Sequence, residues 1–96
     1  MWHTMPAEPI REYVITAHAA FEMKRRGIDE AMLQSVLFEP GQRASVRAGR
    51  DVLEARVTIE DKEFVVRAIV DIDRAPAAVV TVYRTTKIRK YWRSEP

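Results

Sequence analysis

The feature that most constrains this chain is a set of three strand-like segments in its second half. Apolar and polar residues alternate from Val52 to Glu60, which places Arg56 on the side of the strand opposite the apolar residues. Residues 64–72 are almost continuously apolar, a pattern typical of a central strand with both faces partly covered. A third, β-branched run covers residues 77–84. Because short turns separate the three segments, they predict an antiparallel sheet.

The first half of the chain carries the start and stop signals of two short helices. Thr16 can cap a helix over residues 17–26 by accepting a hydrogen bond from the amide of His18 or Ala19. Gly27 is suited to the left-handed residue that ends it, in a Schellman motif. Asp29 can then cap a second helix over residues 30–38. The short connection predicts a helical hairpin with one apolar seam.

Together these elements predict one α+β domain, in which an N-terminal helical hairpin packs on one face of a three- to four-stranded antiparallel sheet. Residues 43–47 supply the optional fourth strand. We expect residues 1–12, which hold two prolines and no periodicity, to form an irregular lead-in to a domain over residues 13–96. Residues 13–16 have strand composition, but the run is short.

The composition excludes several classes of protein. The chain has 96 residues and no cysteine, so it has no disulfide framework, thiol nucleophile or cysteine-ligated zinc. No apolar run approaches the roughly 20 residues of a membrane-spanning helix. The first six residues lack the pattern of a signal peptide. We therefore expect a cytoplasmic protein with no membrane partner and no cofactor.

The C-terminal third is the positive end of a chain whose net charge is only +2. Residues 84–93 interleave basic side chains with Tyr91 and Trp92, the mixture that phosphate binding and base stacking require. The same spacing also suits a terminal helix that docks Ile88, Tyr91 and Trp92 on the sheet while the basic residues stay in solvent. The sequence fits both a nucleic-acid-binding tail and a terminal helix docked on the sheet.

Arg67 is the most informative single residue, because it interrupts the apolar central strand. An arginine there needs a carboxylate, a carbonyl or a phosphate as partner. Glu54 or Asp71 on the sheet can provide it, and so can a nucleic acid. If Val80 and Val82 face the core, then Thr81 and Tyr83 share the open face of the sheet with Arg56.

Two further patterns suggest chemistry. His18 lies at the start of the first predicted helix, where the helix dipole favours the neutral ring that a general base needs, although a lone histidine is often structural. The acidic and lysine residues over positions 60–62, with Asp51 upstream, resemble part of a metal-dependent nuclease site, but they also suit a charged turn. A metal site is therefore the minor alternative, and we predict none.

The residues from Tyr13 to Ile28, followed by a second capped helix that ends near Pro40, resemble the bacterial domain-of-unknown-function family 4258. The opening of that family reads roughly T-x-H-A-x-x-R-M-x-x-R-G-I, and the matching residues here are Thr16, His18, Ala19, Met23, Arg26, Gly27 and Ile28. Residues 79–83 also look like the end of the family. The chain departs from the pattern at Glu22, where the family has arginine, so no role of that arginine is transferred.

Such domains resemble the small ribonuclease toxins of toxin–antitoxin pairs, including the RelE-like and BrnT-like groups. The resemblance implies a metal-independent RNA endonuclease with a RelE- or barnase-like architecture. It also implies an antitoxin partner of the zinc-finger, helix-turn-helix MqsA kind. Cleavage would proceed by attack of the 2′-hydroxyl, which needs a base, a cation at the phosphate and an acid for the leaving oxygen.

The sequence offers candidates for each of these roles. We predict His18 or Tyr83 as the base, Arg67 with Arg84 at the scissile phosphate, and Lys87 or Tyr91 at the leaving group. Further candidates hold flanking phosphates or stack on a base, namely Arg47, Arg50, Arg56 and Trp92. The competing interpretation is a non-catalytic module that binds nucleic acid or protein through the basic tail and the open sheet face.

Overall fold

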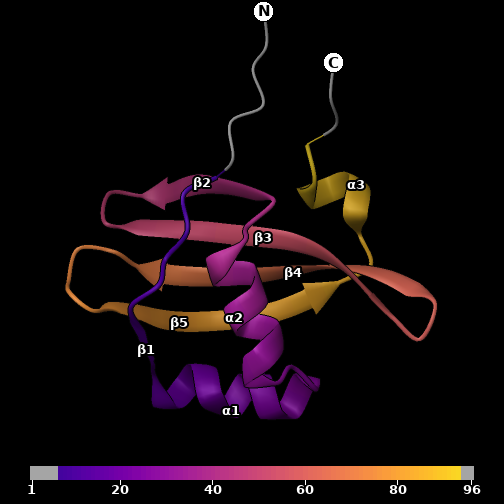
Figure 1. The fold of residues 1–96 in the computed structure, drawn as a ribbon, viewed down its shortest axis with the longest axis horizontal. Helices are drawn as coiled ribbons and strands as arrows, with labels where there is room; N and C mark the ends of the chain where they lie inside the picture. The colour runs from indigo at the N-terminus through magenta and orange to yellow at the C-terminus, as the bar shows by residue number, and fades with distance from the viewer. Residues whose placement is uncertain (1–6, 94–96) are drawn as a thin grey trace, which may run out of the picture.

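The computed structural model describes residues 7–93 as a five-stranded sheet with two helices packed against one face and a short C-terminal helix near the other (Figure 1). The elements in chain order are β1 (Tyr13–Ile15), α1 (Ala17–Arg26), α2 (Glu30–Phe38), β2 (Gln42–Arg47), β3 (Arg50–Ile59), β4 (Lys62–Asp71), β5 (Ala77–Thr85) and α3 (Ile88–Tyr91). The strand order is β1-β5-β4-β3-β2, so β4 is the central strand. The α+β class and the central position of residues 64–72 are confirmed.

The expected sheet of three or four antiparallel strands is wrong, because a fifth strand, β1, joins it. The sheet is mixed, because β1 pairs in parallel with the first part of β5, and Tyr13 lies opposite Ala77. The pairing continues into the start of α1, where the Thr16 amide donates to the Val79 carbonyl at 3.1 Å. Three residues form a strand here because β5 supplies the backbone partners, which the local sequence does not reveal.

The local signals for both helices are confirmed. The Thr16 hydroxyl accepts from the Ala19 amide at 3.1 Å, and Asp29 Oδ1 accepts from the Met32 amide at 2.8 Å. Gly27 has φ of 69°, and the Ile28 amide donates to the Met23 carbonyl at 2.9 Å, which closes the Schellman motif. The caps fix both ends of α1 through contacts between near neighbours in the chain.

The predicted hairpin is not what the two helices form. In Figure 1, α1 runs along the direction of the strands beside β5, whereas α2 crosses over β3 and β4. Each helix therefore packs mainly on the sheet and not on the other helix. The reason is the apolar surface available, because the single buried stripe of α2, Leu33, Val36 and Leu37, is covered by the strands beneath it.

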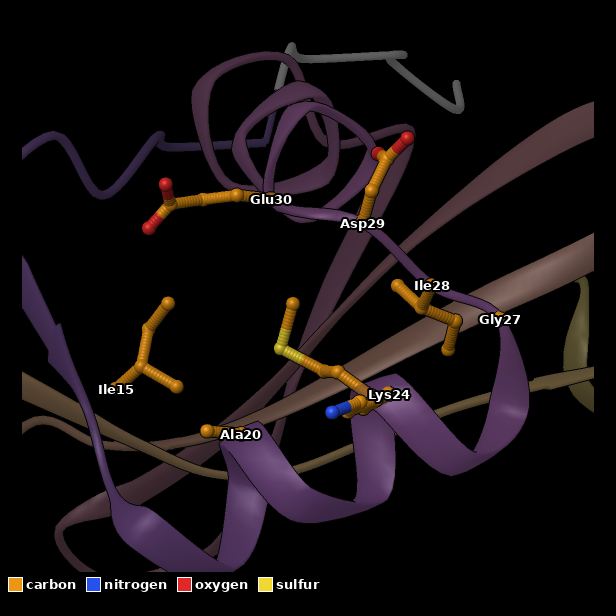
Figure 2. A pocket seen from close by; sticks show the side chains of 8 residues that line it. Ile15, Ala20, Lys24, Gly27, Ile28, Asp29 and Glu30 are labelled. Carbon is orange, nitrogen blue, oxygen red and sulfur yellow. The ribbon is translucent and has the colours of Figure 1, made fainter.

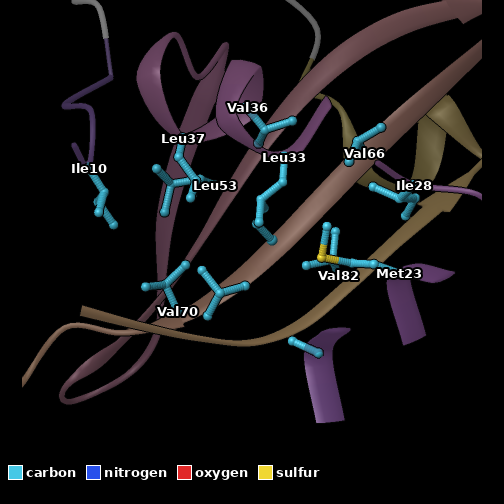
Figure 3. Packing of buried hydrophobic residues seen from close by; sticks show 13 residues of the cluster. Ile10, Met23, Ile28, Leu33, Val36, Leu37, Leu53, Val66, Val70 and Val82 are labelled. Carbon is cyan, nitrogen blue, oxygen red and sulfur yellow. The ribbon is translucent and has the colours of Figure 1, made fainter. Parts of the chain in front are cut away.

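The hydrophobic core fills the space between the helices and the sheet (Figure 3). Leu33, Leu53 and Val66 are fully buried at its centre. Ile10 also reaches this core, and its amide donates to the Leu37 carbonyl at 2.8 Å. Residues 7–12 form no helix or strand. The remainder of the predicted lead-in, together with residues 94–96, lies outside the described residues.

A β-bulge in β5 changes which residues face the core. The register with β4 shifts between Ile69, which pairs with Thr81, and Val70, which pairs with Val79. Val79 and Val82 therefore reach the core, and the prediction that Val80 does so is wrong. The predicted placement of Tyr83 on the opposite, open face is correct, because Tyr83 pairs directly with Arg67. None of the three helices within residues 7–93 has the length and apolar character that crossing a membrane would require.

Candidate functional site

The open face of the sheet carries a row of four polar residues from four neighbouring strands, Gln42, Glu54, Arg67 and Tyr83. The strand register places each member opposite the next, from β2 through β3 and β4 to β5. We call this set the central row. Hydrogen bonds join each side chain of the row to the next. Gln42 Nε2 and Arg67 Nε both donate to the Glu54 carboxylate, and Arg67 Nη1 donates to the Tyr83 hydroxyl.

Arg67 therefore has the carboxylate partner that its place in an apolar strand requires. Glu54 is 4% exposed, and the Arg67 side chain is 17% exposed. Of the two acids predicted as partners, Glu54 is correct, whereas Asp71 pairs with Arg50 at 2.6 Å. Arg67 Nη2 has no hydrogen-bond partner within residues 7–93, so part of the guanidinium can still meet a ligand.

Two of the other arginines predicted to hold phosphates are neutralised across the sheet. Arg50 donates to Asp71 through two nitrogens, and Arg56 does the same to Glu63. These hydrogen bonds lower the pKa of the Asp71 and Glu63 carboxyls. Arg47 is exposed at the far end of β2, beside the turn to β3 and remote from Arg67 along the strand. The structure does not gather these three arginines at the central row.

A pair of tyrosines lies at the β5 end of the central row. The ring of Tyr91, from α3, meets Tyr83 edge to face with centroids 6.4 Å apart, and the Arg67 guanidinium lies 4.1 Å from the Tyr91 centroid. Burial raises the pKa of Tyr83. Hydrogen bonds from Tyr83 and Lys90 lower the pKa of Tyr91. Two chemically identical groups in contact therefore differ in acidity, a pattern typical of acid–base sites.

The C-terminal segment docks on the sheet, as one of the two open interpretations predicts. Gln42 Nε2 donates to the Tyr91 carbonyl at 2.7 Å, and the Arg93 amide donates to Gln42 Oε1 at 3.2 Å. The Trp92 ring lies against Gly41 and 5.7 Å from the Arg56 guanidinium. Because the Trp92 ring packs against the sheet, only part of the ring is free to stack on an RNA base, the role predicted for it. The basic side chains of this segment remain exposed.

A substitution at Gly41 should displace Trp92 without entering the core. A Cβ atom on Gly41 would lie 2.3 Å from the edge of the indole ring, so Gly41→Ala should move the ring away. In a Trp2→Phe background, the emission of Trp92 should shift to longer wavelength. Ser45→Ala, at an exposed position in β2, the strand that follows Gly41, should leave the spectrum unchanged. An unshifted spectrum in Gly41→Ala would contradict the docking of Trp92.

His18 and Arg84 do not join the central row. His18 is exposed on α1 and makes no contact with Arg67 or Tyr83 within the described part of the chain. Arg84 lies next to Tyr83 in β5, so the strand period of two points it to the helix side of the sheet. There its guanidinium is 4.9 Å from the Phe64 centroid and close to Gly27. The predicted pairing of Arg67 with Arg84 at one phosphate is wrong.

The arginine that lies beside the Tyr83 ring is Arg26, from α1. Its Nη1 donates to the Val82 carbonyl at 3.0 Å, and its guanidinium lies 5.8 Å from the Tyr83 centroid. Glu22, only 8% exposed, holds Arg26 at 2.9 Å and Arg25 at 2.7 Å. The spacing of four residues between Glu22 and Arg26 was a signal for this ion pair, but nothing local indicated the contact with Tyr83.

The Glu22 contacts predict a dependence of stability on pH. Hydrogen bonding from Arg25, with the charges of both arginines, lowers the pKa of Glu22 in the folded protein. A lowered pKa stabilises the fold above the unfolded-state pKa, and this stabilisation is lost as the pH falls through the folded-state pKa. Glu22→Gln should therefore be less stable than the natural chain at pH 7 in urea unfolding, and the difference should shrink as the pH falls through the folded-state pKa of Glu22. Glu39→Gln, at an exposed position with no ion pair in the described region, should show little difference over the same pH range.

The carboxylates do not form a metal site in the described region. No three histidine or acidic side chains between residues 7 and 93 are grouped to hold a metal ion. Asp51 pairs with Arg43 near the start of β3, whereas Glu60 and Asp61 form the turn after its other end. Nine extended residues separate Asp51 from Glu60 by about 30 Å. The minor metal-nuclease alternative is therefore wrong in its geometry.

Comparison with curated proteins and with solved structures gave no significant match. A family model did match, over residues 15–84, and its description is "Domain of unknown function (DUF4258)". The match begins in β1 and ends in β5, so it includes both capped helices and all four members of the central row, but not Tyr91. Because it covers most of the chain, this protein belongs to the DUF4258 family.

Proposed function

We propose that this chain is a metal-independent endoribonuclease that acts as the toxin of a toxin–antitoxin pair. One observation carries the proposal, namely the contact of Tyr83 with Tyr91 beside the partly buried Arg67, whose guanidinium lies 4.1 Å from the Tyr91 centroid. Tyr91, the more acidic phenol, suits the base. Tyr83 keeps its proton and suits the acid, and Arg67 suits the cation at the phosphate.

The proposed reaction uses these three side chains in turn. Tyr91, as the phenolate, takes the proton from the ribose 2′-hydroxyl, whose oxygen attacks the adjacent phosphorus. Arg67 Nη2 stabilises the charge that develops on the phosphoryl oxygens. The bond to the 5′-oxygen breaks, and that oxygen takes the proton of Tyr83. The products are a 2′,3′-cyclic phosphate and a 5′-hydroxyl end, and proton transfer between the two contacting phenols restores the starting state.

The exposed basic side chains of the C-terminal segment support RNA as the substrate. Lys87, Arg89, Lys90 and Arg93 have no ion-pair partner between residues 7 and 93. They lie on the same segment as Tyr91, which contacts the central row. Phosphates bound by these side chains would therefore place the RNA backbone next to Tyr91 and Tyr83. The family resemblance supports an antitoxin partner of the zinc-finger, helix-turn-helix kind.

The direct test is incubation of the purified protein with total RNA in excess EDTA, followed by mapping of the cut ends. Cleavage with 5′-hydroxyl and 2′,3′-cyclic phosphate ends is the expected result. A folded protein that leaves RNA intact, alone and with ribosomes, would overturn the enzymatic proposal.

A non-catalytic binding module is the second candidate. The cross-sheet ion pairs favour it, because Arg50, Arg56 and Arg67 are already paired with carboxylates. RNA would then bind mainly to the exposed basic residues of the C-terminal segment. In that case RNA should bind without being cut. Replacement of Lys87 or Lys90 by alanine should then weaken binding in modest steps and reduce its salt dependence.

A further inference from the structure

A pocket on the helix side of the molecule lies outside the central row. It has a volume of about 520 Å³ and is lined by residues of β1, α1 and the start of α2 (Figure 2). Ile15, Met23 and Ile28 form apolar walls. The side chains of Asp29 and Glu30 lie on the α2 side of this pocket, and Lys24 lies on the α1 side. The pocket thus has an apolar interior and charges of opposite sign on its two sides.

A large apolar side chain stands on α1, next in sequence to residues that line this pocket. Phe21 is 63% exposed, the most exposed of the large apolar residues between positions 7 and 93. It immediately follows Ala20 and lies three residues before Lys24, both of which line the pocket. In Figure 1, the side of α1 that faces away from the sheet is covered by no other element. An exposed phenyl ring and an open apolar pocket on one surface are typical of an interface.

The charges around these two features are complementary. Lys24, one helical turn after Phe21, borders the pocket on its α1 side, whereas Asp29 and Glu30 border it on its α2 side. Arg25 also follows Phe21 but is paired with Glu22. Lys24, Asp29 and Glu30 make no ion pair within the described part of the chain. A two-fold axis beside α1 would bring the basic residues near Phe21 of one copy to the acidic border of the other, and the reverse.

From this arrangement we propose that the chain forms a two-fold symmetric dimer through α1, in which Phe21 of each copy fills the pocket of the other. A second copy is the partner that satisfies both features at once, since it covers Phe21 and fills the pocket with the same contact. An unrelated protein that filled the pocket would leave Phe21 in solvent unless it carried a pocket of its own.

The test is the mass of the full-length protein in solution, measured by sedimentation equilibrium over a range of concentrations. The natural chain should show twice the mass of one chain. Phe21→Asp should raise the dissociation constant of the dimer at least tenfold, because it places a carboxylate in the apolar pocket. Val46→Asp, at a site that is 50% exposed on β2, should leave the dimer unchanged. Circular dichroism checks that each variant is folded.

Charge exchange gives a second, independent test. Lys24→Glu should weaken the dimer, because it opposes the acidic border of the partner, and Glu30→Lys should do the same. The double variant Lys24→Glu with Glu30→Lys restores opposite charges across the two-fold axis and should recover most of the affinity. A natural chain that stays monomeric, a Phe21→Asp dimer of undiminished affinity, or a double variant no better than the singles would each overturn the proposal.

Discussion

Replacing Arg67 by alanine should lower the free energy of unfolding by about 3 kcal/mol, because it leaves the carboxylate of Glu54 buried without its cation. Glu54 is 4% exposed, and only the Gln42 amide would remain as its hydrogen-bond donor. The Tyr83 hydroxyl would also lose the donor that Arg67 Nη1 provides. A domain of this size has about 5 to 15 kcal/mol of stability, so the variant should be close to unfolding.

Urea unfolding of matched variants checks this prediction. Arg56→Ala removes an arginine from an equivalent cross-strand ion pair on the same face, but its side chain and that of Glu63 are 41% and 43% exposed. Water can solvate the remaining carboxylate there, so the cost should stay below about 1 kcal/mol. The double variant Glu54→Leu with Arg67→Met, which replaces the buried pair with apolar side chains, should recover most of the loss.

An Arg67→Ala protein as stable as Arg56→Ala would show that the central row does not support the fold. If the prediction holds, Arg67→Ala alone is a poor test of catalysis. Tests of catalysis therefore need variants that preserve the Arg67–Glu54 pair.

Removing the Tyr91 hydroxyl should lower the rate of RNA cleavage by about 100-fold or more, the range expected when a general base or acid is lost. Tyr91→Phe keeps the ring that Arg67 and Tyr83 contact and removes only the group that takes the proton. Tyr83→Phe should have a similar effect, since it removes the proton donor. Single-turnover rates in EDTA measure both losses.

Tyr13→Phe is the matched control for these two variants. Tyr13 lies in β1 and packs against the helix-side core, away from the central row. Its replacement removes one phenolic hydroxyl from the chain without touching Arg67. Cleavage by Tyr13→Phe should match that of the natural chain, and a loss equal to that of Tyr91→Phe would indicate an effect on the fold instead of on catalysis.

The pH dependence separates the two tyrosines. Because the pKa of Tyr91 lies below its ordinary value, its reactive phenolate becomes more abundant as the pH rises toward that pKa. The rate should therefore increase with pH while Tyr91 loses its proton and fall only when Tyr83, whose pKa is raised, loses its own. Tyr91→Phe should lose the rising limb. A pH-independent rate for the natural chain would exclude Tyr91 as the base.

The elements of the fold were predictable where neighbouring residues define them. Thr16, Gly27 and Asp29 set the ends of α1 and α2 by hydrogen bonds that span three to five residues. The alternation in β3 likewise predicted which side faces the core. The strand β1 was missed because its pairing with β5 joins residues more than 60 positions apart, such as Tyr13 and Ala77.

The candidate site was predictable only in part. Arg67 was found because a charge in an apolar strand needs a partner, and the strand period restricted that partner to a short set that included Glu54. The pairing of Arg67 with Arg84 failed because neighbouring residues of β5 point to opposite faces. Arg26 was missed, since its contact with Val82 joins residues 56 positions apart.

By itself, the sequence of this protein determined the helix ends, the turns, the face of each long strand and the need of Arg67 for a partner. These features depend on backbone conformation and on hydrogen bonds between residues a few positions apart, so the sequence of each segment is enough to define them. The tertiary structure alone decided that β1 joins the sheet, that Arg26 meets Tyr83 and that α3 brings Tyr91 to Arg67. Those contacts arise when distant segments bury their surfaces together, so no local pattern contains them.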